Sequence, residues 1–252
     1  MLINGREPRV LVACPTLGLN PDPDIWLNSL IRILNGFRRE NFTHAVFCPY
    51  KQLWWQANNL IWDCAFSEKF DYILRIDDDI HGVPDDAVSM LLNANKDVIG
   101  AAYCNQRYPY TVNAMVRSAD DTFANIYKGS TKAYVQSVQW HGYEGTGVEH
   151  VELIGFGMTL IKVAPFKFLE RPMYKGEEDC PDDSYFAQVC LDNKIEQFVH
   201  WGVRLKHRHV TFQNAGHLYN ADTLEMHPEI NKENNESVLL ADANKPTEVA
   251  NA

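Results

Sequence analysis

The sequence contains no long hydrophobic run. No stretch approaches the ~20 consecutive apolar residues that a membrane-spanning helix requires. The first residues, MLINGREPRV, lack the basic region and the following apolar region of a signal peptide. From these absences we expect a protein without a membrane span that is located in the cytoplasm.

Cysteine patterns typical of metal sites are also missing. None of the six cysteines belongs to a Cys-x-x-Cys pair, and no cysteine–histidine spacing matches a zinc site. In a chain of this size we expect buried or free thiols in a reducing compartment. A Walker-type phosphate loop, G-x-x-x-x-G-K-S/T, is absent as well, which excludes a P-loop enzyme.

Positive charge is scarce. The chain has 23 Lys and Arg residues against 33 Asp and Glu residues, so its formal net charge is −10. An acidic surface repels phosphate backbones, which argues against general binding of DNA or RNA. The exception is a short stretch in which Arg204, Lys206 and Arg208 alternate with His207 and His209. These basic residues are candidates for contacts with phosphates or an anionic acceptor, and the alternative is a solvated edge strand.

The rest of the composition is that of a globular protein. The 252 residues are 46% hydrophobic and 22% charged, and they suffice for one large domain or two small ones. Strand-like apolar runs alternate with segments of helical periodicity, which predicts an α/β fold with a mostly parallel sheet flanked by helices. The expected strands cover 9–14, 44–50, 70–77 and 97–104, and the expected helices begin at Asp24, at 52 and at Pro84.

The second half of the chain is less regular. Residues 111–152 predict antiparallel strands and loops, and an apolar region at 150–163 is interrupted by Gly155 and Gly157. These glycines permit either a close backbone approach to a ligand or a strand bulge. Further expectations are a short helix at 165–171, a helix at 183–194, a final strand at 200–210 and an extended or partly disordered polar tail at 216–252.

An acidic cluster follows the third expected strand. Asp77, Asp78 and Asp79 come directly after the apolar run, in RIDDDIHGVPDD. Three neighbouring carboxylates repel one another, so this arrangement is costly unless a cation compensates. Alternate residues of an extended chain share a face, so Asp77 and Asp79 can together contact a divalent ion beside a phosphate group. The alternative is a solvated acidic turn that caps the helix beginning near Pro84.

This stretch, FDYILRIDDDIHGVPDDAVSMLL, resembles the nucleotide-sugar glycosyltransferases of the GT-A fold, in which an apolar strand ends in a D-x-D motif. Asn59 matches the asparagine of a second family segment, whereas Asn58 stands where the family usually has an arginine. The segments that resemble the family in the expected order are QANNLIWDCAF at 56–66, DVIGAAYCNQRYP at 97–109 and ELIGFGMTLIKVAPFKFL at 152–169. The resemblance covers roughly residues 8–210, which is most of the chain.

The resemblance implies one GT-A domain at residues 1–215, with a nucleotide-sugar-binding half at 1–110 and an acceptor and catalytic half at 111–215. In the family the D-x-D motif holds Mn²⁺ or Mg²⁺, which bridges the diphosphate of the sugar donor. Asp79 is then the firmest metal ligand, and Asp77 lies near the ribose and the metal. The donor is a nucleoside-diphosphate sugar, with a UDP-sugar as the first choice, and its implied contacts are Pro15, Thr16, Asn59, Asp77, Asp78 and Arg107.

Two further elements of the family concern the metal and the catalytic base. A histidine near the end of the core often completes the metal coordination; His207 matches that position best, and His209 stays open as an alternative. PDDSYFAQV resembles the family's E-D-x-x-F element, in which Asp183 matches the catalytic base of inverting members and Asp182 replaces the more usual Glu. A retaining reaction needs no such base, and an Asp at a helix start is also an ordinary N-cap.

The implied activity is a metal-dependent transfer of a sugar to an acceptor hydroxyl. The chain resembles small bacterial or phage-encoded glycosyltransferases, and for a phage protein the expected location is the host cytoplasm. The acceptor is either a glycan precursor or a modified base of phage DNA, and the net charge of −10 counts against DNA. Two other hypotheses stay open: another metal-dependent phosphoryl-chemistry enzyme, such as a nucleotidyltransferase or phosphohydrolase, and an inactive nucleotide-sugar-binding protein.

Overall fold

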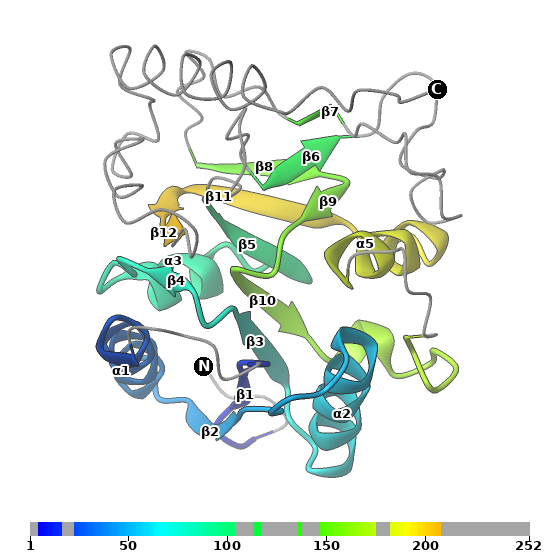
Figure 1. Cartoon of the computed structure of the whole chain (residues 1–252), viewed down its shortest axis with the longest axis horizontal. Helices are drawn as coiled ribbons and strands as arrows, with labels where there is room; N and C mark the ends of the chain where they lie inside the picture. The colour runs from blue at the N-terminus through cyan, green and yellow to red at the C-terminus, as the bar shows by residue number, and fades with distance from the viewer. Residues whose placement is uncertain are drawn as a thin grey trace, which may run out of the picture.

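A seven-stranded sheet forms the centre of the molecule (Figure 1). The computed structural model describes residues 5–16, 23–103, 113–116, 136–137, 147–174 and 182–207. In this part of the chain the strand order is β2-β1-β3-β10-β5-β11-β8. The strands are β1 (Arg9–Ala13), β2 (Thr43–Phe47), β3 (Tyr72–Ile76), β5 (Val98–Ala102), β8 (Val148–Val151), β10 (Met158–Lys162) and β11 (Gln197–Arg204).

The sheet is mixed, with one prevailing direction. Strands β2, β1 and β3 are parallel neighbours, and β10 is antiparallel to both β3 and β5, so β5 runs in the same direction as β3. Strand β11 is parallel to β5, and β8 is antiparallel to β11. Five of these seven strands therefore share one direction, and their carboxyl ends meet at one edge. The α/β class and the mostly parallel sheet expected from the sequence are confirmed.

The sheet separates two hydrophobic cores. In β1, Leu11 and Ala13 belong to one core while Val10 and Val12 belong to the other, because alternate strand residues point to opposite faces. Burial on both faces explains why the strands read as continuous apolar runs. One face is covered by α2 (Trp54–Ser67), the 3₁₀ turn η1 (Ala164–Phe166) and α5 (Asp182–Asp192), and the other by α1 (Pro23–Arg39) and α3 (Ala87–Asn93).

Two small antiparallel sheets complete the described fold. One joins β6 (Ala114–Val116), β7 (Gln136–Ser137) and β9 (Leu153–Ile154). The other joins β4 (Ile80–His81) to β12 (Lys206–His207). Antiparallel strands were the expectation for residues 111–152, and the antiparallel pairing of β6 with β7 confirms it for the described residues of that range. Within those residues no helix has the length and apolar character needed to cross a membrane.

The expected bounds of the final strand and of the helix at Pro84 were wrong, and the short helix expected at 165–171 is the 3₁₀ turn Ala164–Phe166. The final strand is not continuous over 200–210: β11 ends at Arg204, and after the buried Leu205 the chain leaves the main sheet to pair with β4. Helix α3 begins at Ala87 rather than at Pro84, because residues 84–86 form a turn in which the Ala87 N–H donates to the Pro84 carbonyl at 3.2 Å. The expected tail at 216–252 lies outside the described residues.

Candidate functional site

The acidic cluster forms a turn at the carboxyl end of β3. The Asp77 N–H donates to the Gly157 carbonyl at 3.3 Å, and the Ile80 N–H donates to the Asp77 carbonyl at 3.3 Å. The chain then enters β4, whose Ile80 pairs with His207 of β12. This pairing places His207 Nε2 3.1 Å from Asp79 Oδ2. The departure of β12 from the main sheet therefore brings together two residues that the sequence predicts as metal ligands.

The third predicted metal ligand lies slightly apart. Asp77 Oδ1 is 3.7 Å from Arg75 Nη2, and 37% of the Asp77 side chain is exposed. Among the described residues, no group of three or more His, Cys, Asp or Glu side chains is arranged to hold a metal ion. The protein thus presents the pair Asp79 and His207, an oxygen and a nitrogen donor. Such a pair suits a divalent cation whose remaining ligands are water and phosphate oxygens.

The end of β1 lies beside this turn. Thr16 Oγ1 donates a hydrogen bond to Asp78 Oδ2, and Thr16 forms an isolated parallel bridge with Tyr50. Burial raises the pKa of Asp78, although the Thr16 hydroxyl acts in the opposite direction. Pro15, Thr16 and Asp78, which the sequence predicts as donor contacts, therefore occupy one place at the carboxyl edge of the sheet.

A second acidic pair begins α5. Asp182 Oδ2 accepts hydrogen bonds from Asn58 Nδ2 and Arg75 Nη2, each at 3.1 Å. Asp182 Oδ1 accepts the Asp183 N–H at 3.1 Å. Asp183 Oδ1 accepts the Ser184 N–H at 2.7 Å, a bond within the first turn of its own helix. The side chain of Asp182 is thus hydrogen-bonded to α2 and β3, whereas that of Asp183 is hydrogen-bonded within α5.

Arg75 connects the two acidic groups. Its side chain is 4% exposed, and Nη2 reaches both Asp182, at 3.1 Å, and Asp77, at 3.7 Å. The guanidinium also lies 4.8 Å from the centre of the Phe156 ring. The sequence analysis did not single out this residue. The signal that could have identified it is a charged side chain inside the strand YILRI, whose five residues are all buried.

Two carboxyl groups in the site have strongly raised pKa values. Desolvation by the surrounding protein raises the pKa of Asp77 to about 7, although part of its side chain reaches solvent. The positive charge of Arg75 acts in the opposite direction, and the negative charge of Asp182 adds to the rise. Burial, followed by the neighbouring Asp182 charge, raises the pKa of Asp183 to about 6. Carboxyl groups that titrate near neutral pH are frequent in sites that transfer protons or bind cations.

Tyr103 is buried and packs against His207. Its hydroxyl accepts the Gly157 N–H at 2.9 Å and a hydrogen bond from Asn113 Nδ2, and its ring meets the His207 ring edge-on at 5.3 Å. A Cβ at Gly155 would lie 1.6 Å from Asn113 Nδ2, and one at Gly157 would lie 2.5 Å from Tyr103 Cε1. The close approach that these glycines permit is therefore to two side chains of the protein itself.

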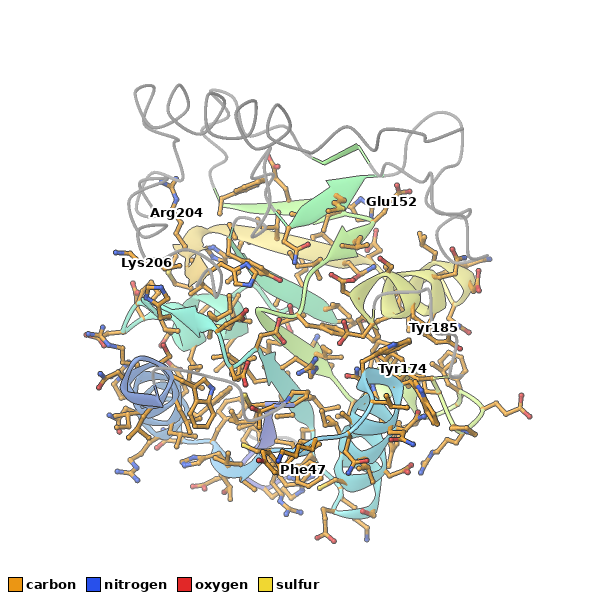
Figure 2. All side chains as sticks on the ribbon, viewed as in Figure 1. Phe47, Glu152, Tyr174, Tyr185, Arg204 and Lys206 are labelled. Carbon is orange, nitrogen blue, oxygen red and sulfur yellow. The ribbon has the colours of Figure 1, made fainter. Side chains whose placement is uncertain are left out.

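The Asn59 side chain forms two hydrogen bonds with the backbone of Tyr174. Its Nδ2 donates to the Tyr174 carbonyl at 2.8 Å, and its Oδ1 accepts the Tyr174 N–H at 2.9 Å. Tyr174 in turn stacks on Tyr185 of α5, with ring centres 5.2 Å apart (Figure 2). The side chain of Asn59 thus has protein partners, and its predicted role in holding the nucleotide stays a prediction.

The basic stretch is described in part. Arg204 Nε donates to the Trp201 carbonyl at 3.1 Å. Lys206 pairs with His81 in the sheet of β12 and β4. Because adjacent strand residues point to opposite faces, Lys206 and His207 occupy opposite faces of β12. Figure 2 shows Arg204 and Lys206 far from the tyrosines near α5. Arg107, Arg208 and His209 lie outside the described residues.

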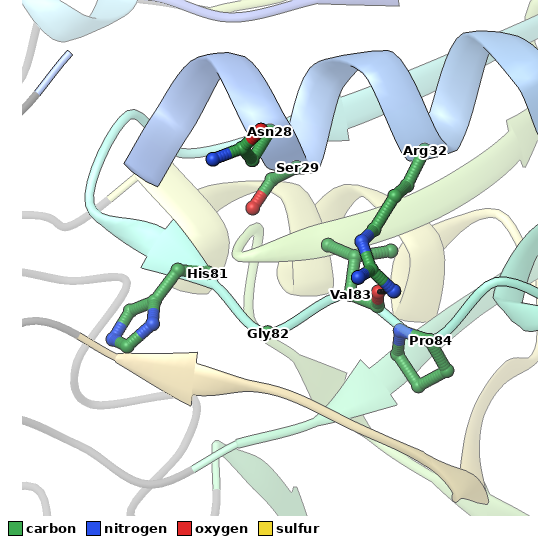
Figure 3. A pocket seen from close by; sticks show the side chains of 7 residues that line it. All are labelled: Asn28, Ser29, Arg32, His81, Gly82, Val83 and Pro84. Carbon is green, nitrogen blue, oxygen red and sulfur yellow. Dashed lines mark hydrogen bonds between the residues drawn. The ribbon is translucent and has the colours of Figure 1, made fainter. Parts of the chain in front are cut away.

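A cavity of about 440 Å³ lies between α1 and the segment that follows the acidic turn. Arg32 on its rim pairs with Asp85 at 3.0 Å. Its lining contains none of the three aspartates of the turn, so it is a neighbour of the acidic site rather than part of it. The lining residues are Asn28, Ser29, Arg32, His81, Gly82, Val83 and Pro84 (Figure 3).

Comparison with known proteins identifies similar structures and no sequence family. No family model matches the chain, and no curated protein does. The structure is similar to A197 from STIV (TM-score 0.48, 14% identity, 79% of this chain and 85% of that chain covered). It is also similar to a Drosophila β1,4-galactosyltransferase 7 mutant in complex with manganese, UDP-Gal and xylobiose (TM-score 0.45, 14% identity, 96% and 82% covered).

A third similar structure is that of a glycosyltransferase involved in the glycosylation of the major capsid of PBCV-1 (TM-score 0.40, 9% identity, 81% of this chain and 95% of that chain covered).

Proposed function

We propose that the protein is a metal-dependent glycosyltransferase that moves a sugar from a nucleoside-diphosphate sugar to an acceptor hydroxyl. One observation carries the proposal: the acidic turn after β3 and the acidic pair that begins α5 meet at one place, where Arg75 contacts Asp77 and Asp182. The acidic turn is suited to binding a cation and a diphosphate, and the acidic pair of α5 offers a carboxylate for proton transfer.

The donor is expected to bind across the carboxyl ends of β1 and β3. Asp79 and His207 would hold a divalent cation, Mn²⁺ or Mg²⁺, with Asp77 near it. When bound, the cation neutralises the negative charge that develops on the departing diphosphate. Thr16 and Asp78 would contact the nucleoside, and UDP is our first choice of nucleotide.

Asp183 is the proposed catalytic base. Its pKa of about 6 leaves it mostly ionised at neutral pH while keeping it basic enough to accept a proton from an attacking hydroxyl. This role applies to a reaction that inverts the anomeric centre. Asp182, whose oxygens accept hydrogen bonds from Asn58, Arg75 and the Asp183 N–H, serves as an anchor.

A glycan precursor is the proposed acceptor, in preference to a modified base of DNA. The net charge of −10 opposes the approach of a phosphate backbone. A titration with duplex DNA at increasing salt checks this choice, because DNA affinity falls steeply with salt and glycan affinity does not. Salt-sensitive binding of DNA by the wild-type protein would favour the modified base.

The donor site is tested by thermal unfolding with UDP, GDP, CMP, ADP and dTDP, each with and without Mn²⁺. A ligand at 100 times its dissociation constant adds about 2.7 kcal/mol to stability. We expect one diphosphate to stabilise the protein only with Mn²⁺, and Asp79→Ala to abolish this effect. Asp85→Ala, which changes an exposed carboxylate outside the turn, is the matched control. The absence of any shift would contradict the proposal.

The products distinguish the remaining hypotheses. A glycosyltransferase releases a nucleoside diphosphate, whereas a nucleotidyltransferase releases pyrophosphate and a phosphohydrolase releases phosphate. A protein that binds the nucleotide sugar without turning it over would be an inactive binding protein.

A further inference from the structure

We propose that Arg75 is a positioning residue that assigns different roles to Asp182 and Asp183. The inference rests on the proposed function. Arg75 is the next-to-last residue of β3, where it pairs in register with Ala13 of β1 and Thr159 of β10. A guanidinium in such a buried place is costly unless carboxylates compensate its charge. Here the compensating carboxylates are Asp77 and Asp182, which belong to the two halves of the site.

The contacts of Asp182 separate it from Asp183. Arg75 Nη2 and Asn58 Nδ2 both donate to Asp182 Oδ2, and the Asp183 N–H donates to Asp182 Oδ1. Asp182 is therefore held by donors from α2, β3 and α5. Asp183 accepts bonds from Ser184 of its own helix turn, at 2.7 Å from N and 3.4 Å from Oγ. Arg75 thus leaves Asp183 as the carboxylate of the pair that can receive a proton.

The same ion pair fixes where α5 begins. Because Asp182 is the first residue of α5, a bond from β3 to its side chain sets the position of Asp183 relative to the acidic turn. Two other donors of Arg75, Nε and Nη1, are buried without a hydrogen-bond partner among the described residues. Part of the bonding capacity of the guanidinium is thus unused, and the ion pairs that it makes go to Asp77 and Asp182.

The test compares Arg75→Lys, Asp182→Asn and the double variant in sugar transfer. Lysine keeps the charge and loses the planar fork, so we expect kcat to fall about 10²-fold, as for a misplaced reacting group, with the dissociation constant of the Mn²⁺–nucleotide complex unchanged. The double variant should be no slower than the slower single variant, because both changes break one linkage. Arg9→Lys is the control, since Arg9 also lies over an aromatic ring, Phe70, and lies away from the site.

Three outcomes overturn the inference. Additive losses of kcat in the double variant would mean that Arg75 and Asp182 act independently. A loss of nucleotide affinity with unchanged kcat would make Arg75 a donor-binding residue. A wild-type protein that transfers no sugar would contradict the proposed function and this role together, whereas active wild type with additive variants would contradict this role alone.

Misfolding of Arg75→Lys would also lower kcat, so a second variant that keeps Arg75 is needed. Asn58→Ala removes the other bond to Asp182 Oδ2 and leaves the guanidinium in place. We expect a smaller fall in kcat, again without a change in nucleotide affinity. Unchanged kcat in both Asn58→Ala and Asp182→Asn would show that anchoring Asp182 does not matter for the reaction.

Discussion

Asp182 and Asp183 show how two identical neighbours acquire different chemistry. The side chain of Asp182 is bonded to Asn58 and Arg75, whereas Asp183 accepts bonds from the first turn of α5. Burial and the Asp182 charge raise the pKa of Asp183 to about 6. The environment, rather than residue type, therefore distinguishes an anchor from a candidate base.

The Asp183→Asn variant tests this distinction. Removing a general base typically lowers a rate 10²–10⁴-fold, so we expect sugar transfer to fall by at least ~10²-fold with nucleotide affinity unchanged. Steady-state kinetics and nucleotide titration measure the two quantities. Asp192→Asn at the other end of α5 is the control and should remain active. Full activity of Asp183→Asn would exclude the base and favour a retaining reaction.

At the scale of elements, the site depends on how the chain around residues 153–158 packs. The backbone at Gly155 and Gly157 lies against Asn113 and Tyr103, and Tyr103 in turn contacts His207. The Gly157 carbonyl also accepts the N–H of Asp77. The link between β9 and β10 therefore supports both the acidic turn and the histidine.

A methyl group at residue 157 should disturb this support. In Gly157→Ala the new Cβ would meet the Tyr103 ring at 2.5–2.6 Å, against a side chain that is fully enclosed. We expect the free energy of unfolding to fall by ~1–3 kcal/mol, as for other overpacked cores. Gly202→Ala is the control, because its Cβ meets the flexible end of Met90. Urea unfolding measures both variants, and equal stability losses would argue against a specific role for the Tyr103 contact.

At the scale of the whole molecule, acidic residues outnumber basic ones. The net charge is −10, and Asp77 and Asp183 have pKa values of about 7 and about 6 against an ordinary value of 3.8. At pH values between the ordinary pKa and these raised pKa values, Asp77 and Asp183 bind more protons in the folded protein than in the unfolded chain. Stability should therefore fall as the pH rises from about 4 to about 7, and then level off.

Thermal unfolding at about pH 5 and about pH 8, with and without Mn²⁺, tests this expectation. Without Mn²⁺ the protein should be less stable at the higher pH. Mn²⁺ should stabilise it more there, because cation binding favours the ionised carboxylates. Asp77→Asn should reduce the loss of stability on raising the pH, whereas Asp85→Asn should not. A protein that is more stable at the higher pH without Mn²⁺ would contradict the raised pKa values.

The sequence alone determined the α/β class, four strands and three helices of the first hundred residues and the acidic turn after β3, but neither β4 nor the start of α3. These features depend on local patterns: hydrophobic periodicity, and carboxylates placed where an apolar strand ends. It also predicted helix α5 with Asp182 and Asp183 at its start. In each case the information lies within a short window of chain.

Only the tertiary structure decided which of these residues meet. His207 reaches Asp79 across 128 positions because β12 leaves the main sheet for β4, and Arg75 reaches Asp182 across 107 because β3 lies in the sheet beneath the start of α5. Asn59, predicted as a donor contact, bonds to Tyr174 across 115 positions. Such contacts depend on how separate elements pack, and no periodicity within a single segment encodes them.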